Sequence, residues 1–349
     1  MALTFPASPT TGSLDLTTAG LYIFDGTGWT QKADGSNAAI FMNNMFLYRT
    51  IYTRGYVSNG YQNGTPWRNV NRTVHTTDTT TNLGDIQSTS GSYLDGGWSD
   101  YYHYVYNASG ANGGSSVTVS SMNMATEAAR TQATSWNLKT SRSNCGALMN
   151  PSLSAAYITG GASTTTDKHN FATETMYNAG SVSACPTGGG GGGGVSRWFG
   201  STYGWAWANG AGGTLSWSTE VWTSGGLTIT TDGQPKGLST KLGWGYCAEG
   251  TYGGSNYYKK INDLTGATIA TGAAGQRPES AGEENCQVGQ YWGYTLGSYN
   301  GVNQTNNSTK VMYMTDTVTA MGAATQPSGH AGMSSGACGS ASAMILSGA

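Results

Sequence analysis

Short segments in which apolar and polar residues alternate recur along the chain. Residues 116–124 read Ser-Val-Thr-Val-Ser-Ser-Met-Asn-Met, and a period near two places the apolar side chains on one face of a β-strand. Such segments do not show the 3.6-residue period that helical repeats require. They are separated by Gly, Asn and Ser, which favour turns. The pattern therefore predicts an all-β fold.

Two sequence markers recur in step along most of the chain. The first is an aromatic residue followed about four positions later by Gly or another small residue, and its positions are Tyr56, Tyr106, Tyr157, Trp205, Tyr246 and Tyr294. The second is an acidic residue, usually after Thr, and its positions are Asp78, Glu127, Glu174, Glu220, Asp263 and Asp316. A repeat of roughly 45 to 50 residues built from strands is typical of a β-propeller, whose blades are four-stranded antiparallel sheets.

The markers also predict how such a ring would close. We expect the aromatic segments to form inner strands and the acidic segments to lie in outer hairpins. Residues 342–348 resemble the aromatic segment at 155–160, residues 22–29 resemble an outer hairpin, and residues 37–43 resemble residues 144–150. Because a blade shared by the two termini hides sheet edges, we predict seven blades with the termini sharing one blade. Six blades plus a small N-terminal module is the alternative.

The order of segments in each unit carries a resemblance to a known repeat. An aromatic and glycine segment is followed by a Thr-acid segment, then by Trp136 or Trp222, and then by a basic turn such as Arg142 or Arg277. This order resembles the kelch repeat, and Tyr-Ile-Thr-Gly-Gly at residues 157–161 is the closest match. The resemblance implies a kelch-like β-propeller, which we expect over residues 21–349, after an N-terminal extension at residues 1–20.

Composition and charge narrow the classes of function. Gly supplies 54 of 349 residues and charged residues make up 10%, against usual values of about 7% and about 25%. The net charge is −2, and neither sign forms a run, which disfavours nucleic acid and membranes as partners. The five cysteines have no Cys-x-x-Cys spacing, so we expect reduced, buried thiols.

Residues that could carry chemistry are scattered. The four histidines, His75, His103, His169 and His330, lie far apart and have no metal-binding spacing, although loops of a propeller could assemble a composite metal site. The seven glycines at residues 188–194 lack the Lys and Ser/Thr of a phosphate-binding loop, so a flexible loop is expected.

The acidic marker is predicted to be structural. It recurs in every unit, whereas catalytic acids occur once or twice in a site, and bonding turn amides is a role that each blade needs. Four tryptophans are expected to be buried between blades, with stacking on sugars or a partner protein as the alternative; they are Trp67, Trp98, Trp198 and Trp292. The sequence therefore assigns no catalytic, cofactor-binding or metal-binding residue, and predicts a non-enzymatic protein without a cofactor.

The N-terminal segment carries a second resemblance. Pro6, Pro9 and Gly12 form a Pro-x-x-Pro-x-x-Gly lead before an aromatic strand and an Asp-Gly-x-x-Trp turn that ends at Trp29. This arrangement resembles a segment frequent near the start of bacteriophage tail and fibre proteins. It implies a virion structural protein of the tail, fibre, collar or capsid decoration, assembled in the host cytoplasm.

The same resemblance suggests partners. A lead with two prolines is stiff and hydrogen-bonds poorly within its own sheet, so Leu3, Phe5, Pro6 and Pro9 are candidate docking residues for other virion proteins. A host-surface glycan is a further candidate partner. The alternatives are a carbohydrate-binding propeller lectin and, third, a glycan-active enzyme.

Overall fold

The protein is described by a computed structural model in which the chain divides into two compact units, Met1–Thr50 and Ile51–Ala349. The described residues are 14–17, 20–24, 27, 29–34, 54–62, 65–75, 77–85, 96–100, 103–108, 116–142, 145–150, 154–160, 163–178, 196–199, 202–208, 211–225, 236–239, 244–248, 257–262, 264–276, 285–288, 292–299, 304–313 and 315–321. The sequence-based boundary after residue 20 differs from this division after Thr50.

Within the first unit, the described residues form one three-stranded antiparallel sheet. Its strands are β1 (Leu14–Thr17), β2 (Gly20–Phe24) and β3 (Trp29–Asp34), in the order β1-β2-β3. Phe24 pairs with Trp29 at the start of the β2–β3 register, so the hairpin expected at residues 22–29 is confirmed. The hairpin and the strand before it belong to the same sheet, which is why the compact unit extends past residue 20.

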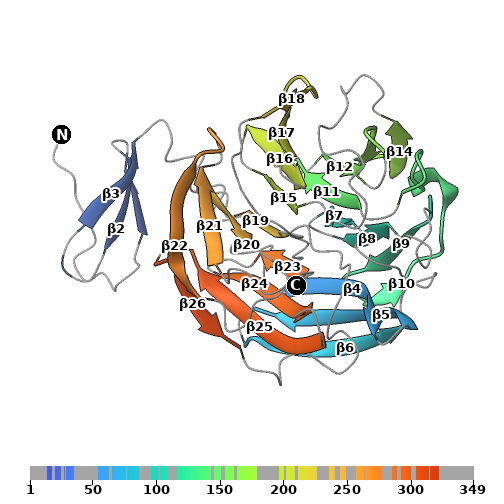
Figure 1. Ribbon diagram of the computed structural model, residues 1–349, viewed down its shortest axis with the longest axis horizontal. Helices are drawn as coiled ribbons and strands as arrows, with labels where there is room; N and C mark the ends of the chain where they lie inside the picture. The colour runs from blue at the N-terminus through green and yellow to red at the C-terminus, as the bar shows by residue number, and fades with distance from the viewer. Residues whose placement is uncertain are drawn as a thin grey trace. The chain divides into compact units, whose positions relative to one another are not determined.

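Within the described part of the second unit, six antiparallel sheets follow one another along the chain (Figure 1). The first contains β4 (Arg54–Gln62), β5 (Thr65–Val74) and β6 (Thr79–Asp85). The second contains β7 (Gly97–Ser99), β8 (Tyr104–Ala108), β9 (Val119–Asn123) and β10 (Ala128–Ala129). The third contains β11 (Cys145–Met149), β12 (Ala155–Gly160), β13 (Thr166–Asn170) and β14 (Thr175–Asn178).

The other three sheets have the same four-stranded order. The fourth contains β15 (Ser196–Phe199), β16 (Tyr203–Ala208), β17 (Ala211–Ser216) and β18 (Trp222–Ser224). The fifth contains β19 (Lys236–Ser239), β20 (Trp244–Ala248), β21 (Tyr257–Asn262) and β22 (Thr268–Gln276). The sixth contains β23 (Asn285–Val288), β24 (Trp292–Tyr299), β25 (Gln304–Met312) and β26 (Thr317–Ala320). Apart from one short 3-10 helix, η1 (Thr134–Trp136), the described elements are all strands, so the all-β prediction is confirmed.

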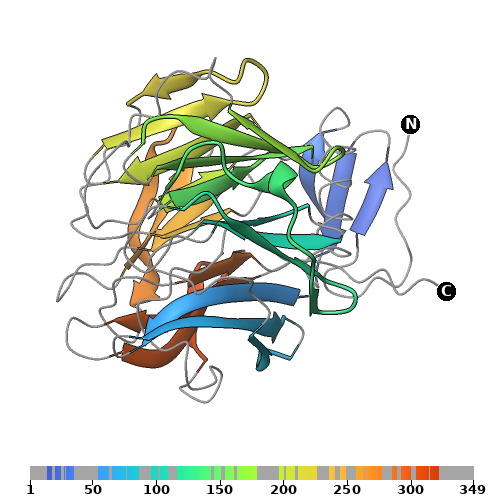
Figure 2. The same cartoon turned by 90° about the vertical axis from the view of Figure 1, so that its right-hand side faces the viewer.

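Neighbouring sheets contact one another in a cyclic succession. The first strands β7, β11, β15, β19 and β23 each contact the next, and β23 then contacts β4 of the first sheet. Figures 1 and 2 both show the sixth sheet, in orange to red-brown, beside the first sheet, in blue. A cluster that includes Val57 and Tyr294 packs between these two sheets, and a second cluster that includes Tyr56 and Val105 packs between the first and second sheets.

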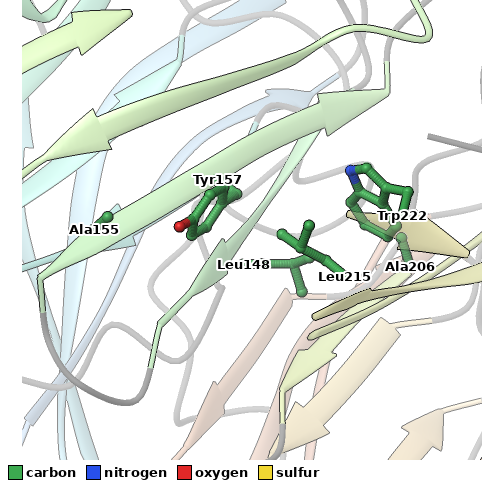
Figure 3. Close-up of a cluster of buried hydrophobic side chains, with 6 residues drawn as sticks. All are labelled: Leu148, Ala155, Tyr157, Ala206, Leu215 and Trp222. Carbon is green, nitrogen blue, oxygen red and sulfur yellow. The ribbon is translucent and has the colours of Figure 1, made fainter. Parts of the chain in front are cut away.

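The core lies between the sheets. Figure 3 shows one cluster in which Leu148 and Tyr157 of the third sheet meet Leu215 and Trp222 of the fourth. The indole nitrogen of Trp222 also donates a hydrogen bond to Oγ1 of Thr166 in the third sheet, at 3.0 Å. Alternating strands therefore bury apolar side chains against the neighbouring sheet, as a period of two requires.

The structure places the aromatic marker in a different strand from the one expected, and the acidic marker in the expected hairpin. The aromatic residues lie in the second strand of each four-stranded sheet, not in the first. The first strands are short and lack a recurring marker, so the sequence offered no signal for them. The acidic residues precede the last strand of their sheets, in the hairpin where they were expected, except that Gly266 holds the equivalent position in the fifth sheet. Asp263 lies outside the described residues.

Several predictions about the ends and loops concern residues that the structure does not describe. The shared blade depends on residues 342–348, and the related segment at 37–43 and the glycines at 188–194 also lie outside the described ranges. The seven-blade arrangement with a shared blade therefore stays a prediction.

Candidate functional site

The acidic marker occupies an unusual backbone conformation in the turn after the third strand. Five acidic residues have a positive φ of 48° to 57°; they are Asp78, Glu127, Glu174, Glu220 and Asp316. Each lies four positions after the last residue of the strand that comes before the final strand of its sheet, which is β5 in the three-stranded first sheet and the third strand in the four-stranded sheets. A left-handed conformation is easiest for Gly and costs other residues about 1–2 kcal/mol. A carboxylate retained at this position in five turns therefore indicates that the side chain has a specific role.

In the second and fifth sheets, bonding turn amides, the role suggested by sequence, belongs instead to the asparagine that ends the third strand. The side-chain oxygen of Asn123 accepts hydrogen bonds from the amides of residues 125 and 126. Asn262 does the same for the amides of residues 264 and 265. Asn readily bonds nearby backbone in this way. The carboxylates are thus left to make contacts beyond their own turn.

Each of the five carboxylates accepts a hydrogen bond from the marker tyrosine of the preceding sheet. The pairs and oxygen–oxygen distances are Tyr56–Glu127 at 3.2 Å, Tyr106–Glu174 at 2.7 Å, Tyr157–Glu220 at 2.6 Å, Tyr294–Asp78 at 3.0 Å, and Tyr246–Asp316. The acidic turn of one sheet is therefore joined to the second strand of its neighbour. The two sequence markers are partners in space, one sheet apart.

A basic side chain completes each contact. In the first sheet Arg72 is the cross-strand partner of Tyr56, and its Nη1 lies 2.8 Å from Oε2 of Glu127. The equivalent bases are Lys168 to Glu220, Lys260 to Asp316 and Lys310 to Asp78. We call each set of tyrosine, base and carboxylate a latch. Its charge-assisted hydrogen bonds are stronger than neutral ones.

The second sheet builds its latch with a substitute base. Ser121 stands opposite Tyr106, where the first, third, fifth and sixth sheets have Arg or Lys. Arg130, just after β10, replaces it: its two terminal nitrogens lie 2.8 and 2.9 Å from the two carboxylate oxygens of Glu174. The same guanidinium contacts Oγ of Ser121 at 3.3 Å. The geometry is bidentate, which fixes direction as well as charge.

Aromatic rings hold several of these bases from the other side. The Arg130 guanidinium lies 3.6 Å from the ring centroid of Tyr104. The ammonium groups of Lys260 and Lys310 lie 4.3 Å from the rings of Trp244 and Trp292, respectively. Such cation–π contacts contribute roughly 0.5–2 kcal/mol, more as the site loses water. They keep the long basic side chains pointed at the neighbouring carboxylate.

The latches shift the pKa values of their members. Burial, together with the charge of Glu127, raises the pKa of Tyr56 to about 12, and burial and the facing carboxylate raise the pKa of Tyr294 further. The hydrogen bond from Arg130 lowers the pKa of Glu174. Burial acts to raise the pKa of Glu220, but the hydrogen bonds from Lys168 and Tyr157 outweigh it and lower that pKa. The carboxylates of Glu174 and Glu220 are therefore held in their charged form, and the phenols of Tyr56 and Tyr294 in their neutral form.

The latch between the sixth and first sheets has an additional ring contact. Tyr294 stacks on the imidazole of His75, with centroids 4.6 Å apart and planes 12° from parallel. Its hydroxyl also lies 3.2 Å from the carbonyl oxygen of His75. His75 and Asp78 belong to one turn of the first sheet, so a single tyrosine contacts that turn at two points.

A buried histidine joins the second and third sheets. The indole of Trp98 donates a hydrogen bond to Nδ1 of His169 at 2.9 Å, so the imidazole proton resides on Nε2. Within the described residues this Nε2 has no hydrogen-bond partner. The rings of Tyr106 and Phe171 meet the imidazole edge to face at 4.6 and 5.5 Å. Burial lowers the pKa of His169 to about 4.

A buried ion pair between Arg142 and Asp167 also has a structural role. Arg142 and Asp167 are both buried, and Nε of the arginine lies 3.5 Å from Oδ2 of the aspartate. The guanidinium donates to the carbonyls of Gly160 and Thr165, and the carboxylate accepts from the amides of residues 139–140. The basic turn found in the sequence therefore holds the connection between the second and third sheets.

The other candidates from the sequence fall in different places. Trp98 is buried, as expected, and Trp292 is half-buried beneath Lys310. The side chains of Trp67 and Trp198 and the candidate docking residues Leu3, Phe5, Pro6 and Pro9 lie outside the description. In the described ranges no group of three or more His, Cys, Asp or Glu could hold a metal ion. Nor does any helix there have the length and apolar character needed to cross a membrane.

Sequence reasoning missed the bases of the latches. A signal was present: Arg72, Lys168 and Lys310 each precede an acidic marker residue by six positions. Because each base bonds the acid of the next sheet rather than the acid that follows it, this spacing alone does not reveal the partner. Comparison of the sequence with known protein families and with curated proteins found no match.

Proposed function

We propose that the second unit is a six-bladed β-propeller whose blades are the six sheets. The proposal is supported by the cyclic succession of contacts, in which β23 meets β4, and by the latch from Tyr294 to Asp78. Full closure removes exposed sheet edges. This is the six-blade alternative with a separate N-terminal module, and it agrees with the division after Thr50.

The function that this arrangement supports best is that of a non-enzymatic structural scaffold. The observation that carries it is the use of the recurring carboxylates: each is held by a phenol and a base in a contact between sheets. A general acid or base instead needs a proton that substrate can reach and a pKa near the working pH. The facing bases and phenols lower the pKa values of Glu174 and Glu220, and the repetition of the latch matches a role needed at each junction.

The N-terminal segment suggests the kind of particle in which such a scaffold would work. The Pro-x-x-Pro-x-x-Gly lead and the Asp-Gly-x-x-Trp turn resemble bacteriophage tail and fibre proteins, and the hairpin at β2 and β3 agrees with that pattern. The protein would then be a virion component of the tail, fibre, collar or capsid decoration. Leu3, Phe5, Pro6 and Pro9 would dock it on other virion proteins.

Two experiments test this function. Mass spectrometry of purified particles from the natural source should find the protein at a fixed ratio to the other virion proteins. Deleting residues 2–12 should leave the fold, measured by circular dichroism, unchanged and reduce incorporation into particles. Normal incorporation of the folded deletion variant would refute the docking role. Binding of the isolated protein to a glycan array, without association with particles, would favour the lectin instead.

A further inference from the structure

The latch between the first and second sheets holds one more positive charge than the other latches do. Glu127 accepts a hydrogen bond from Nη1 of Arg72 at 2.8 Å and another from Nη1 of Arg54 at 3.3 Å. In the described part of the chain, each of the other four latch carboxylates is paired with a single base. Two guanidinium groups around one carboxylate leave a formal excess of one positive charge at this junction.

Arg54 occupies a position at which the other five sheets have no base. It lies two residues before the marker Tyr56, and therefore on the same face of β4. The equivalent residues of the second to sixth sheets are uncharged; they are Tyr104, Ala155, Tyr203, Trp244 and Trp292. In three of those sheets the residue is the ring that packs on the latch base. Because the other latches form without a second base, the contact between sheets does not require Arg54.

The two guanidinium groups carry hydrogen-bond donors that Glu127 does not use. A guanidinium presents five N–H donors in a fixed fork, and toward this carboxylate Arg54 and Arg72 each donate from Nη1. Nε of Arg72 is buried and has no hydrogen-bond partner. The side chain of Arg54 is 28% exposed and that of Glu127 is 19% exposed. The cluster is thus reachable from solvent but largely removed from it, where an unpaired charge is costly.

We propose that Arg54, beside Arg72, binds the carboxylate group of an external ligand at the junction of the first and second sheets. A guanidinium fork matches a carboxylate through two parallel hydrogen bonds. One carboxylate also neutralises the single excess charge of the cluster. Arginines already bind carboxylates in two latches, Arg72 to Glu127 and Arg130 to Glu174. The site is an addition to the scaffold role, because the latch is complete without it.

Thermal denaturation of the full chain in sodium acetate, sodium glucuronate or glucose tests the proposal. Sodium chloride keeps the ionic strength equal in all samples, because screening alone alters exposed ion pairs. A ligand that binds the folded chain raises the melting temperature as its concentration passes its Kd. Acetate and glucuronate should raise it relative to chloride, and glucose should not. No rise with either carboxylate, or a rise with glucose equal to that with glucuronate, would overturn the proposal.

Arg54→Tyr removes the proposed binding group and keeps the latch. Tyrosine is the residue at this position in the second sheet, where Tyr104 packs on the guanidinium of Arg130. The Kd for acetate, obtained from the melting temperatures, should weaken by at least about tenfold, because a charge-assisted hydrogen bond is lost. Lys139→Met removes one exposed positive charge elsewhere and is the matched control, which should keep the Kd of the parent. An unchanged Kd in Arg54→Tyr would overturn the proposal.

A second variant keeps the test decisive if Arg54→Tyr does not fold. Glu127→Gln removes the carboxylate that competes with the ligand for the two guanidinium groups. The positive charge at the junction then has no partner, so the Kd for acetate should tighten by at least about threefold. Affinity no tighter than that of the parent protein would overturn the proposal.

Discussion

The hydroxyl of Tyr294 lies 3.0 Å from Oδ1 of Asp78, although 216 positions separate the two residues in sequence. Lys310, which is the cross-strand partner of Tyr294, bonds the other oxygen of the same carboxylate. Because Tyr294 belongs to the sixth sheet and Asp78 to the first, this latch joins the two ends of the succession of sheets. It replaces the chain connection that consecutive sheets have.

Removing the Tyr294 hydroxyl should weaken this junction. Tyr294→Phe keeps the ring that stacks on His75 but loses the hydrogen bond to Asp78, so we expect the free energy of unfolding in urea to fall by about 1–3 kcal/mol. Tyr203→Phe, a tyrosine outside the latches, is the matched control and should change it by less than about 0.5 kcal/mol. Equal effects of the two variants would contradict a latch at this junction.

The ion pair between Lys168 of the third sheet and Glu220 of the fourth sheet should behave as a coupled unit. Glu220→Gln leaves the partly buried Lys168 without its carboxylate, and we expect it to lower the free energy of unfolding by roughly 1–3 kcal/mol. Adding Lys168→Met removes the charge left behind and should recover part of that loss. A double-mutant cycle from urea denaturation measures the coupling. Strictly additive effects would show that the two groups act independently.

Acidification should destabilise the protein through His169. Burial lowers the pKa of this imidazole to about 4 from its usual value of 6.5, so the unfolded chain binds the proton first as the pH falls. The stabilisation of the neutral imidazole is present above pH 6.5 and is lost between pH 6.5 and 4, by roughly 3 kcal/mol in total. Urea denaturation across this range measures the loss.

The control for this titration replaces the imidazole with a side chain that can accept the same hydrogen bond from Trp98. In His169→Asn the side-chain oxygen can accept the hydrogen bond from Trp98 without titrating. The variant should therefore lose less stability between pH 6.5 and 4 than the parent protein does. His103→Asn is the second control, because the side chain of His103 is 67% exposed and its removal should leave the pH dependence as it was. A His169→Asn variant with the pH dependence of the parent would contradict the assignment.

Stability should also be independent of bound metal. The latch carboxylates bond a phenol and a base, as in Tyr106, Arg130 and Glu174, which occupies the oxygens that a cation would need. Elemental analysis should therefore find no stoichiometric transition metal, and EDTA should leave the melting temperature unchanged. One metal ion per chain together with a lower melting temperature in EDTA would favour the enzyme or lectin alternative.

How much of the fold could be read from sequence is clearest at the two markers. Alternation at segments such as residues 116–124 indicated strands, because a strand presents its side chains to opposite faces with a period of two. The spacing of the acidic residues placed them in outer hairpins, where Glu127 and Glu174 are found. For the fifth sheet the sequence pointed to Asp263, which lies outside the described residues, whereas the turn position with the matching backbone conformation is Gly266.

The sequence by itself determined the strands and the repeat, because these depend on local period and turn chemistry. Only the tertiary structure decided that each carboxylate meets a tyrosine 63 to 71 positions earlier, and that Asp78 meets Tyr294 instead. Partners across sheets are set by how the sheets pack, and no local period encodes that. The buried imidazole of His169 became visible for the same reason.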